Sequence, residues 1–328
     1  MKTSPIAVLG AGAWGTALAM LLARNGQQVR LWDLNTDHLL KMQNERAYAG
    51  TPFSDQLLLV PQLCDAVSNV QDICLVVPSH AFRAVLTQLK PMVRSDVRFV
   101  WGTKGLDPTT CHFLHTVVAD VFSKDTPVAV LSGPSFAKEV AQNLPTAVSL
   151  AGNNQAFLDD LTQRFHNHYF RVYQNPDLIG VQLCGVVKNV MAIAVGISDG
   201  MGYGANTRCA LITRGIAELS RLCEALGGRR ETMMSLAGIG DLVLTSTDNQ
   251  SRNRRFGLEI GQGSTAEKAL KKIGESVEGY YNAKQLFQLA ERYKVDMPVC
   301  SQVYEILYEN RLANSVVSAL LDRESTAE

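Results

Sequence analysis

The sequence predicts two domains, an α/β amino-terminal domain built on a parallel sheet and an all-α carboxy-terminal domain. Up to about residue 175, short β-branched segments alternate with stretches whose apolar residues recur at helical spacing. After the turn "QNPD" at 174–177, the strand signals fade and the pattern is mostly helical. A length of 328 residues exceeds one average domain and suits two. We therefore expect one domain at 1–180 and a second at 181–328.

The expected elements follow that division. Alternation of strands and helices is typical of a parallel sheet with helices on both faces. The expected strands are 6–10, 28–33, 72–77, 97–102 and 128–133, with helices between them at 14–26, 81–93 and 109–122. The expected helices of the second domain are 178–197, 207–226, 230–237, 252–261, 265–272, 278–293 and 299–311.

The charge balance argues against a nucleic-acid partner. Lys+Arg and Asp+Glu number 31 each, so no net field draws the chain to nucleic acid or to an anionic membrane. A hydrophobic content of 46% with 19% charged residues is that of a soluble globular protein. Any anion that the chain binds must therefore be held by a local cluster of polar groups.

The cysteines and the apolar segments indicate the cellular compartment in which the protein is expected. The seven cysteines are scattered, without a C-x-x-C pair or histidines at zinc spacing, so neither a disulfide framework nor a metal site is expected. The amino terminus lacks signal-peptide anatomy. The most apolar segment, 181–197, is interrupted by Gln182, Lys188 and Asn189 and is typical of a core helix rather than a membrane span. We expect a cytoplasmic protein with reduced thiols, no metal and no membrane insertion.

A glycine-rich turn, "VLGAGAWGTALA", follows the first expected strand and opens a helix. The first glycine permits the tight turn, the second lets the backbone approach a pyrophosphate, and the third lets the helix pack closely on the strand. This context is the one that a Rossmann-type dinucleotide-binding domain requires, and a glycine turn of purely structural use is the alternative. The candidate cofactor residues of the turn are Gly10, Gly12, Ala13, Trp14 and Gly15.

Asp33 ends the second expected strand, 18 residues after Gly15. A carboxylate at this place accepts hydrogen bonds from the adenosine ribose of NAD and repels the 2′-phosphate of NADP. Arg30 lies earlier in the strand, and no Arg directly follows Asp33. The cofactor is therefore NAD(H) or NADP(H), with NAD favoured by Asp33, and a helix or turn cap is the alternative role for this residue.

Three loops at strand ends carry polar side chains, and the first of them, "VVPSH" at 76–80, is suited to line the nicotinamide. Ligands of an open parallel sheet lie beyond the carboxyl ends of its strands. The loop "WGTKG" at 101–105 places Lys104 between glycines, and "SGPSFAKEV" at 132–140 places Ser135 after a Gly-Pro turn. The residues after Ser135 can begin a helix whose free N–H groups attract an anion. Lys104 taken alone is typical of a solvated loop lysine, but its place at a strand end favours a site.

The segment "GVVKNVMAIAVGI" at 185–197 places Lys188 among apolar residues. In a helix, none of the residues three or four positions away carries a charge. Burial without a fixed carboxylate partner favours a neutral amine, which can take a proton from an alcohol and return it to a ketone. The alternative is snorkelling, in which the amine reaches water past an apolar stem. A preceding cofactor domain favours the acid/base role.

The segment "AGIGDLVLTSTDNQSRNRRFG" at 237–257 adds further polar groups. Asp241 follows a glycine turn and can orient a lysine amine or a substrate hydroxyl. Ser251, Arg252 and Asn253 are expected to begin a helix. Backbone N–H groups, a hydroxyl and a guanidinium then converge, and together they form a cradle for a phosphate group.

Taken together, these segments resemble one enzyme family. The matching stretches, in the family's order, are "GAGAWGTALA", "GTKG", "LSGPSFAKEV", "GVVKNVMAIAVGISDG", "ALITRGIAEL", "GDLVLTSTDNQSRNRRFG" and "ESVEGYYNAK". They are similar to bacterial-type NAD(P)-dependent glycerol-3-phosphate dehydrogenases from the amino terminus to about residue 311. The resemblance implies reversible reduction of a phosphorylated triose, dihydroxyacetone phosphate, to sn-glycerol 3-phosphate, which feeds membrane phospholipid synthesis.

The resemblance also implies roles for individual residues, with Lys188 as the general acid/base. The implied substrate contacts are Lys104, Gly133, Ser135, Lys188, Asp241, Ser251, Arg252 and Asn253. The implied cofactor contacts are Trp14, Lys104, Ala137, Arg252 and Glu278. Two positions depart from the family pattern. Ala205 stands where many members carry Asp, and Asp33 weakens the transfer of any NADP preference.

Two other functions stay open. A β-hydroxyacid or 3-hydroxyacyl-CoA dehydrogenase also joins a Rossmann domain to a helical one. The basic "SRNRRF" segment argues against the acyl-CoA type, as does the presence of only His80 at a strand end. A non-catalytic NAD sensor would have no use for Lys188 or Arg252. The apolar helices of the second domain make a homodimer the expected assembly.

Overall fold

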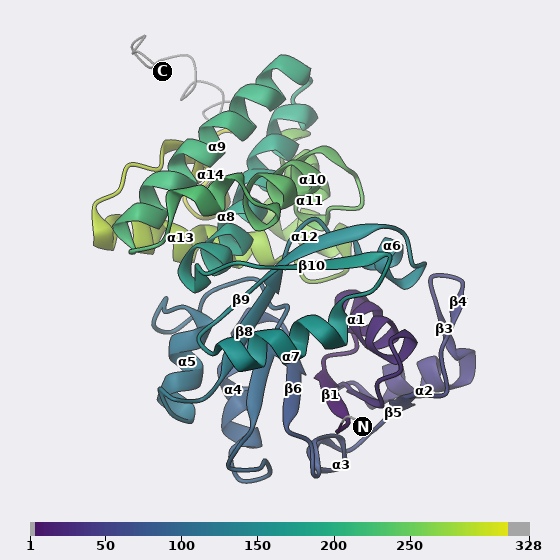
Figure 1. Cartoon of the computed structure of the whole chain (residues 1–328). Helices are drawn as coiled ribbons and strands as arrows, with labels where there is room; N and C mark the ends of the chain where they lie inside the picture. The colour runs from purple at the N-terminus through teal and green to yellow at the C-terminus, as the bar shows by residue number, and fades with distance from the viewer. Residues whose placement is uncertain (1–3, 314–328) are drawn as a thin grey trace. The chain divides into compact units, whose positions relative to one another are not determined.

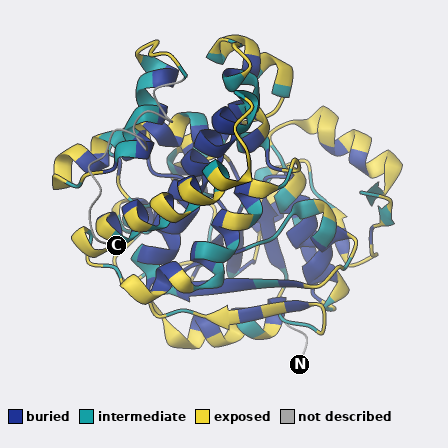
Figure 2. Ribbon diagram, turned by 90° about the horizontal axis from the view of Figure 1, so that it is seen from above, coloured by how far each residue is buried: buried dark blue, intermediate teal, exposed yellow. Residues whose placement is uncertain are grey.

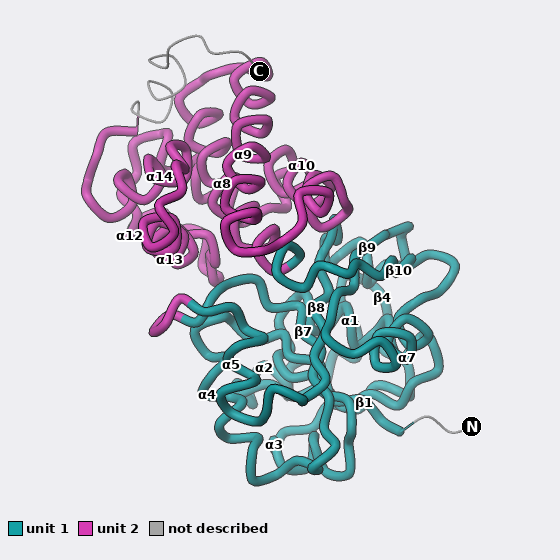
Figure 3. The backbone as a smooth tube through the Cα atoms, turned by 60° about the vertical axis from the view of Figure 1, so that its left-hand side comes forward, with its two compact units in different colours: residues 1–107, 112–181 teal, residues 108–111, 182–328 magenta. Residues whose placement is uncertain are grey.

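The computed structural model describes residues 4–313, and the chain divides into two compact units (Figure 3). Residues 1–107 and 112–181 form the first unit. Residues 108–111 and 182–328 form the second. The chain therefore enters the second unit briefly at 108–111 before it returns to complete the first.

The first unit is built on an eight-stranded sheet, in which every neighbouring pair of strands is parallel except β8–β9. All the strands expected from the sequence form, which confirms the α/β parallel-sheet class. The antiparallel strand β9 was not expected, because its sequence TAVSLAG is rich in residues with a weak strand preference. The strands are β1 Ile6–Leu9, β2 Val29–Trp32, β5 Leu57–Leu59, β6 Asp72–Leu75, β7 Arg98–Trp101, β8 Val128–Ser132, β9 Thr146–Gly152 and β10 Phe170–Gln174, and a separate hairpin is formed by β3 Ala47–Tyr48 and β4 Thr51–Pro52.

The order of the strands locates the ligand edge of the sheet. In space they run β10-β9-β8-β7-β6-β1-β2-β5. From β5 to β8 this is the 3-2-1-4-5-6 order of a Rossmann-type sheet. The winding reverses between β1 and β6, where Leu9 pairs with Leu75. Ligands of such sheets bind beyond the carboxyl ends of the strands at this point, so the turns after Leu9 and Leu75 lie at the ligand edge of the sheet.

Helices cover the sheet in two layers (Figure 1). Helix α1 packs against α6 and α7, and α4 packs against α5. Residues 15–23 of α1 are all buried, so this helix holds the turn before it firmly. Buried residues, dark blue in Figure 2, line the inner faces of the helices and the strands. The helices of the first unit are α1 Ala13–Arg24, α2 Thr36–Glu45, α3 Leu63–Val67, α4 Ser79–Leu89, α5 Leu114–Val121, α6 Ala137–Ala141 and α7 Gln155–Phe165.

The second unit is helical in its described part, as the sequence predicts. Helix α8 is long and apolar enough to cross a membrane by composition alone, but 89% of its most apolar stretch is buried inside the protein. It is therefore the core helix expected from the sequence. The helices are α8 Leu178–Gly200, which begins in the first unit, α9 Ala205–Ala225, α10 Asp241–Thr247, α11 Arg252–Gly261, α12 Ala266–Ile273, α13 Glu278–Tyr293 and α14 Pro298–Tyr308.

The expected helix at 230–237 is wrong. The chain there forms a short 3₁₀ helix, η1 Arg230–Met234, followed by a π-helical turn, η2 Leu236–Gly240. Gly238 has non-helical backbone angles, and a Cβ at this residue would lie 2.3 Å from the carbonyl oxygen of Met233. The close backbone contact at Gly238 breaks the helical path and delivers the chain to the start of α10.

A buried carboxylate joins α9 to α14. Glu218 is 1% exposed and accepts the backbone N–H groups of Val299, at 2.7 Å, and Cys300, at 3.1 Å. These are N–H groups that the first turn of a helix leaves unpaired. Burial raises the pKa of Glu218, and the two N–H bonds act in the opposite direction. Glu218 thus fixes the start of α14 from inside the unit.

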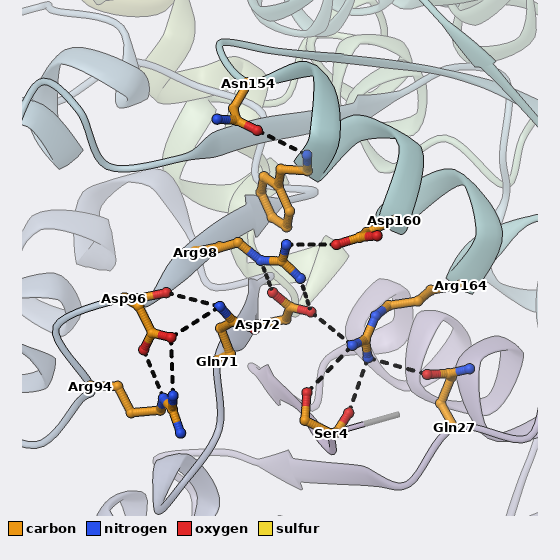
Figure 4. Close-up of polar contacts among 11 residues, drawn as sticks. Ser4, Gln27, Gln71, Asp72, Arg94, Asp96, Arg98, Asn154, Asp160 and Arg164 are labelled. Atoms are coloured by element: carbon orange, nitrogen blue, oxygen red, sulfur yellow. Dashed lines mark hydrogen bonds and ion pairs between the residues drawn. The ribbon is translucent and has the colours of Figure 1, made fainter. Parts of the chain in front are cut away.

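A charge network lies at the amino-terminal edge of the sheet, away from the strand ends that face ligands (Figure 4). Asp72, at the start of β6, is fully buried. It accepts from Arg98 at 2.6 and 2.9 Å and pairs with Arg164 of α7 at 3.1 Å. Arg98 also binds Asp160 at 2.7 Å. The bond between Asp72 and Arg164 holds α7 against the sheet. Loss of a guanidinium partner is costly because it leaves the buried carboxylate less well compensated.

We predict that Asp72→Asn lowers the free energy of unfolding by about 3–5 kcal/mol, because it leaves buried guanidinium charge without its carboxylate. Chemical denaturation of the variant and the wild type measures the difference. Asp96→Asn is the matched control, since Asp96 pairs with Arg94 on the surface in the same region. If Asp96→Asn lowered the free energy of unfolding as much as Asp72→Asn, the larger contribution expected of the buried ion pair would be contradicted.

Candidate active site and cofactor site

The glycine turn after β1 is held against the end of β6 by backbone contacts. Gly10 has φ +108°, and a Cβ there would lie 2.7 Å from the carbonyl oxygen of Val76. A Cβ at Gly15 would lie 1.8 Å from the carbonyl oxygen of Gly10. At Gly12 a Cβ would meet nothing within 4 Å. The outer two glycines are thus required by the fold itself, and the middle one faces open space that a pyrophosphate could approach.

Asp33 holds the same turn from the end of β2. Its Oδ2 accepts the N–H of Ala11 at 2.7 Å, and its Oδ1 accepts the N–H of Asn35 at 2.9 Å. His38 Nε2 lies 3.0 Å from the carbonyl oxygen of Ala11. Asp33 is therefore a turn cap, one of the two roles weighed from the sequence. An ionised carboxylate has about four acceptor positions, so this capping leaves capacity for ribose hydroxyls.

The loop after β7 brings Lys104 to Trp14. A Cβ at Gly102 would lie 2.5 Å from Trp14 Nε1, so the indole rests directly on this glycine. Lys104 Nζ lies 5.7 Å from the centre of the indole ring. Thr103 fixes the loop by donating from Oγ1 to the carbonyl oxygen of Val77 at 2.7 Å. Two residues predicted from separate segments thus lie together in the first unit.

The loop after β8 contains the predicted residues Gly133, Ser135 and Ala137. Ser135 Oγ donates to the carbonyl oxygen of Gly133 at 2.8 Å. A Cβ at Gly133 would lie 2.8 Å from the Cα of Val148, so only glycine fits beside β9. Ala137 begins α6, which is only one turn long, and Arg24 of α1 binds the carbonyl oxygen of Ala141 at its end at 2.7 Å. The expected helix start is present but short.

Lys188 is buried and paired within the second unit. Its Nζ donates to Asp241 Oδ1 at 2.5 Å and to Thr245 Oγ1 at 3.0 Å. The lysine is 8% exposed and the aspartate 1% exposed, which excludes a snorkelling side chain. The expectation of an amine without a fixed carboxylate partner is wrong. The partner comes from α10, 53 residues downstream, beyond the reach of helical neighbours.

The other carboxylate oxygen of Asp241 is buried and lacks a partner in the described residues. Within residues 4–313, Oδ2 of this buried carboxylate has no hydrogen-bond partner. A buried, unpaired carboxylate oxygen is costly unless a donor reaches it, and a substrate hydroxyl is a suitable donor. The sequence had already offered Asp241 for either the amine or a hydroxyl. In the structure, Oδ1 accepts from the amine, and Oδ2 is the oxygen without a partner in the described residues.

The start of α11 is organised as the sequence predicts, with Ser251 as the residue before the helix. Ser251 Oγ accepts the N–H of Arg254 at 3.2 Å. Asn253 donates to Asn189 Oδ1 at 2.9 Å and accepts the N–H of Gly279 at 2.9 Å. It therefore ties α11 to the residue after Lys188 and to the residue after Glu278, which begins α13.

Arg252 is at the same helix start but points to a different partner. Its Nη1 binds Glu275 at 3.0 Å, and both side chains are substantially exposed. An exposed ion pair of this kind contributes little to stability and exchanges readily for another anion. The guanidinium of Arg252 can therefore bind a phosphate. Its neighbour Arg254 is buried and paired with Asp199, so its guanidinium is not accessible in the same way.

Four glycines set the distance between α8 and α11. A Cβ at Gly257 would lie 2.2 Å from the carbonyl oxygen of Ile193, and one at Gly196 would meet α11 just as closely. Gly200 and Gly261 repeat the contact one turn further along. Backbones in such close contact hold the start of α11 beside the lysine-bearing part of α8, as the bond between Asn253 and Asn189 shows.

Two residues of this site were missed by sequence reasoning. Thr245 bonds both Lys188 and Asp241, and Asn189 bonds Asn253. Asn189 carried a signal, since it is a second polar residue within an apolar helix. Thr245 carried none beyond its spacing, four residues after Asp241 on a helix that was not expected.

Comparison with known proteins assigns the chain to a family. Residues 5–158 match the family described as NAD-dependent glycerol-3-phosphate dehydrogenase N-terminus, and residues 177–318 match its C-terminus. The chain is 52% identical to the glycerol-3-phosphate dehydrogenase [NAD(P)+] of Haemophilus ducreyi, over 99% of this chain and 98% of that protein. The chain belongs to the NAD-dependent glycerol-3-phosphate dehydrogenase family. The resemblance read from the sequence is confirmed, and with it membership of an oxidoreductase family.

The fold agrees with that of solved family members. A crystal structure of glycerol-3-phosphate dehydrogenase from Coxiella burnetii matches with a TM-score of 0.95 and 51% identity, over 98% of this chain and 100% of that chain. The α/β domain followed by a helical domain is therefore the architecture of the family.

The glycine contact between α8 and α11 generates a prediction. Gly257→Ala should lower the melting temperature, because its Cβ would collide with backbone, and overpacking of this kind costs about 1–3 kcal/mol. It should also lower kcat/KM in the glycerol-3-phosphate dehydrogenase assay by roughly tenfold or more, since Asn253 and Arg252 shift with the helix. Gly204→Ala is the control, because a Cβ there meets nothing within 4 Å. Equal effects of the two changes would contradict the packing argument.

Proposed function

We propose that the chain catalyses the reversible reduction of dihydroxyacetone phosphate to sn-glycerol 3-phosphate with a nicotinamide cofactor, with Lys188 as the general acid/base. The observation that carries the proposal is the buried Lys188–Asp241 pair with its one unpaired carboxylate oxygen. Family membership and the name of the Haemophilus ducreyi relative support the substrate. In this reading the enzyme works in the cytoplasm and supplies phospholipid synthesis.

The first domain would hold the cofactor. The open space at Gly12 and the buried helix α1 suit a pyrophosphate, and Asp33 suits the adenosine ribose. When bound, the nicotinamide supplies the hydride. The residues of this domain proposed to hold the cofactor are Gly10, Gly12, Ala13, Trp14, Gly15, Asp33, Lys104 and Ala137, and the proposal adds Arg252 and Glu278 from the helical domain.

Lys188 would handle the proton. In the reducing direction its Nζ gives a proton to the C2 oxygen of the ketone, and in the reverse direction it takes that proton from the alcohol. Asp241 and Thr245 hold Nζ in one place, so little orientation is lost when substrate binds. Asp241 Oδ2 accepts a hydrogen bond from a substrate hydroxyl.

The phosphate of the substrate would bind at the start of α11. The exposed Arg252 exchanges Glu275 for the phosphate, and the planar guanidinium binds two of its oxygens. Binding energy from this remote group orients the reacting carbon. The remaining proposed substrate contacts are Lys104, Gly133, Ser135, Ser251 and Asn253.

The alternatives predict different assay results. A β-hydroxyacid or acyl-CoA dehydrogenase would oxidise NADH with other ketones, and a sensor would bind NAD without turnover. An assay that monitors NADH absorbance in the presence of dihydroxyacetone phosphate distinguishes the three candidate functions. A homodimer is also proposed, and light scattering of the purified protein tests it.

We predict that Lys188→Ala lowers kcat by roughly 10²–10⁴-fold, because a positioned general acid/base contributes about that much. The Kd for NADH, from fluorescence titration, should change little. Arg252→Ala is the comparison variant and should chiefly raise the KM for dihydroxyacetone phosphate. A melting curve checks that each variant folds. Turnover that survives the loss of Lys188 in a folded variant would remove the acid/base assignment.

We predict that kcat/KM is higher with NADH than with NADPH, because the carboxylate of Asp33 repels a 2′-phosphate. Asp33→Asn should narrow this preference, since the amide keeps an acceptor for Ala11 or Asn35 but removes the charge. Steady-state kinetics with both cofactors measure the ratio. Equal efficiency in the wild type would leave Asp33 with its capping role alone.

A further inference from the structure

The loop that carries Lys104 is fixed at both ends by other residues of the first unit. At its start, Gly102 N donates to the carbonyl oxygen of Leu75 at 3.0 Å, and Thr103 Oγ1 donates to that of Val77. These contacts tie the loop to the end of β6. Lys104 follows directly, three residues before the second anchor at Asp107.

The second anchor is a buried ion pair. Asp107 is 2% exposed, and its Oδ2 accepts from Arg83 Nε at 3.0 Å and from Nη2 at 2.8 Å. Arg83 lies on α4 and also binds Asp120 of α5 at 3.1 Å. The hydrogen bond to Asp107 is the largest cause of the raised pKa of Arg83. Because the aspartate is buried and charged, it needs this guanidinium to stay in place.

We propose that Arg83 and Asp107 are positioning residues for Lys104, an inference that rests on the proposed role of Lys104 at substrate and cofactor. The backbone position of Lys104 sets where its side chain begins, so a shift of the loop also shifts the amine. The contact of Nζ with the Trp14 ring is weak, about 0.5–1 kcal/mol for an exposed pair. The two fixed ends of the short loop hold the backbone from which the lysine side chain extends.

The geometry explains why an arginine serves here. Two N–H groups of one guanidinium meet a single carboxylate oxygen, and a third contact reaches Asp120 on the next helix. A rigid fork can hold both acids at once, whereas a lysine provides only a point charge. Displacement of the loop by about 1 Å is enough to lower catalytic efficiency strongly.

A double-mutant cycle with the full-length enzyme tests the proposal. Arg83→Met removes the anchor, Asp107→Asn removes its charge while keeping its shape, and each is combined with Lys104→Ala. In the wild-type background each anchor variant should lower kcat/KM by roughly tenfold, and with Lys104→Ala by less than about twofold. Arg83→Lys should recover part of the loss. Asp120→Asn, which leaves both bonds to Asp107 intact, is the matched control and should behave like the wild type.

The outcomes are distinguishable. Equal losses with and without Lys104 would overturn the inference, because the anchor would then act through general stability. Melting curves identify a variant that fails to fold, and in that case the milder Asp107→Asn decides the question. A silent Lys104→Ala would instead overturn the role of Lys104, and a wild type without turnover of dihydroxyacetone phosphate would overturn the proposed function itself.

Discussion

The candidate site of the second unit is built around the buried ion pair of Lys188 and Asp241. Moving a lysine and an aspartate out of water costs several kcal/mol for each charge, and hydrogen-bonded geometry must compensate for it. Lys188 and Asp241 meet this requirement with a 2.5 Å contact and a shared partner in Thr245. Among the residues that the structure describes, none donates to the other oxygen of this carboxylate. An unpaired buried carboxylate oxygen lowers stability, and in the proposed function a substrate hydroxyl supplies the missing donor.

Close backbone packing places other candidate site residues beside the Lys188–Asp241 pair. The glycines of α8 and α11 bring two helices together until their backbones touch, and this contact places the capped start of α11 beside the lysine segment. The first unit uses the same device at Gly10 and Gly15, where the turn rests on the end of a neighbouring strand. In both units glycine is required by close backbone contact, and Gly10 is required by its positive φ as well. These contacts set the positions of candidate site residues.

Sequence reasoning succeeded where the signal was local. The glycine turn, the helix start at Ser251 and the buried helix around Lys188 each depend on neighbours within a few residues, and each is found where expected. It failed where contacts join distant segments. The carboxylate partner of Lys188, the contribution of Thr245 and the break at Gly238 all arise from packing between elements that periodicity does not connect.

The sequence by itself determined the α/β and helical fold classes, the glycine turn and the family, because the alternation of strand and helix signals, the glycine spacing and the order of the motifs can be read along the chain. Only the tertiary structure decided which polar groups meet. It paired Lys188 with Asp241, gave Arg252 an exposed and exchangeable partner, and fixed the Lys104 loop to Arg83 through Asp107. Charge pairing acts through space over a few ångströms, and the separation of two residues along the chain does not reveal that distance.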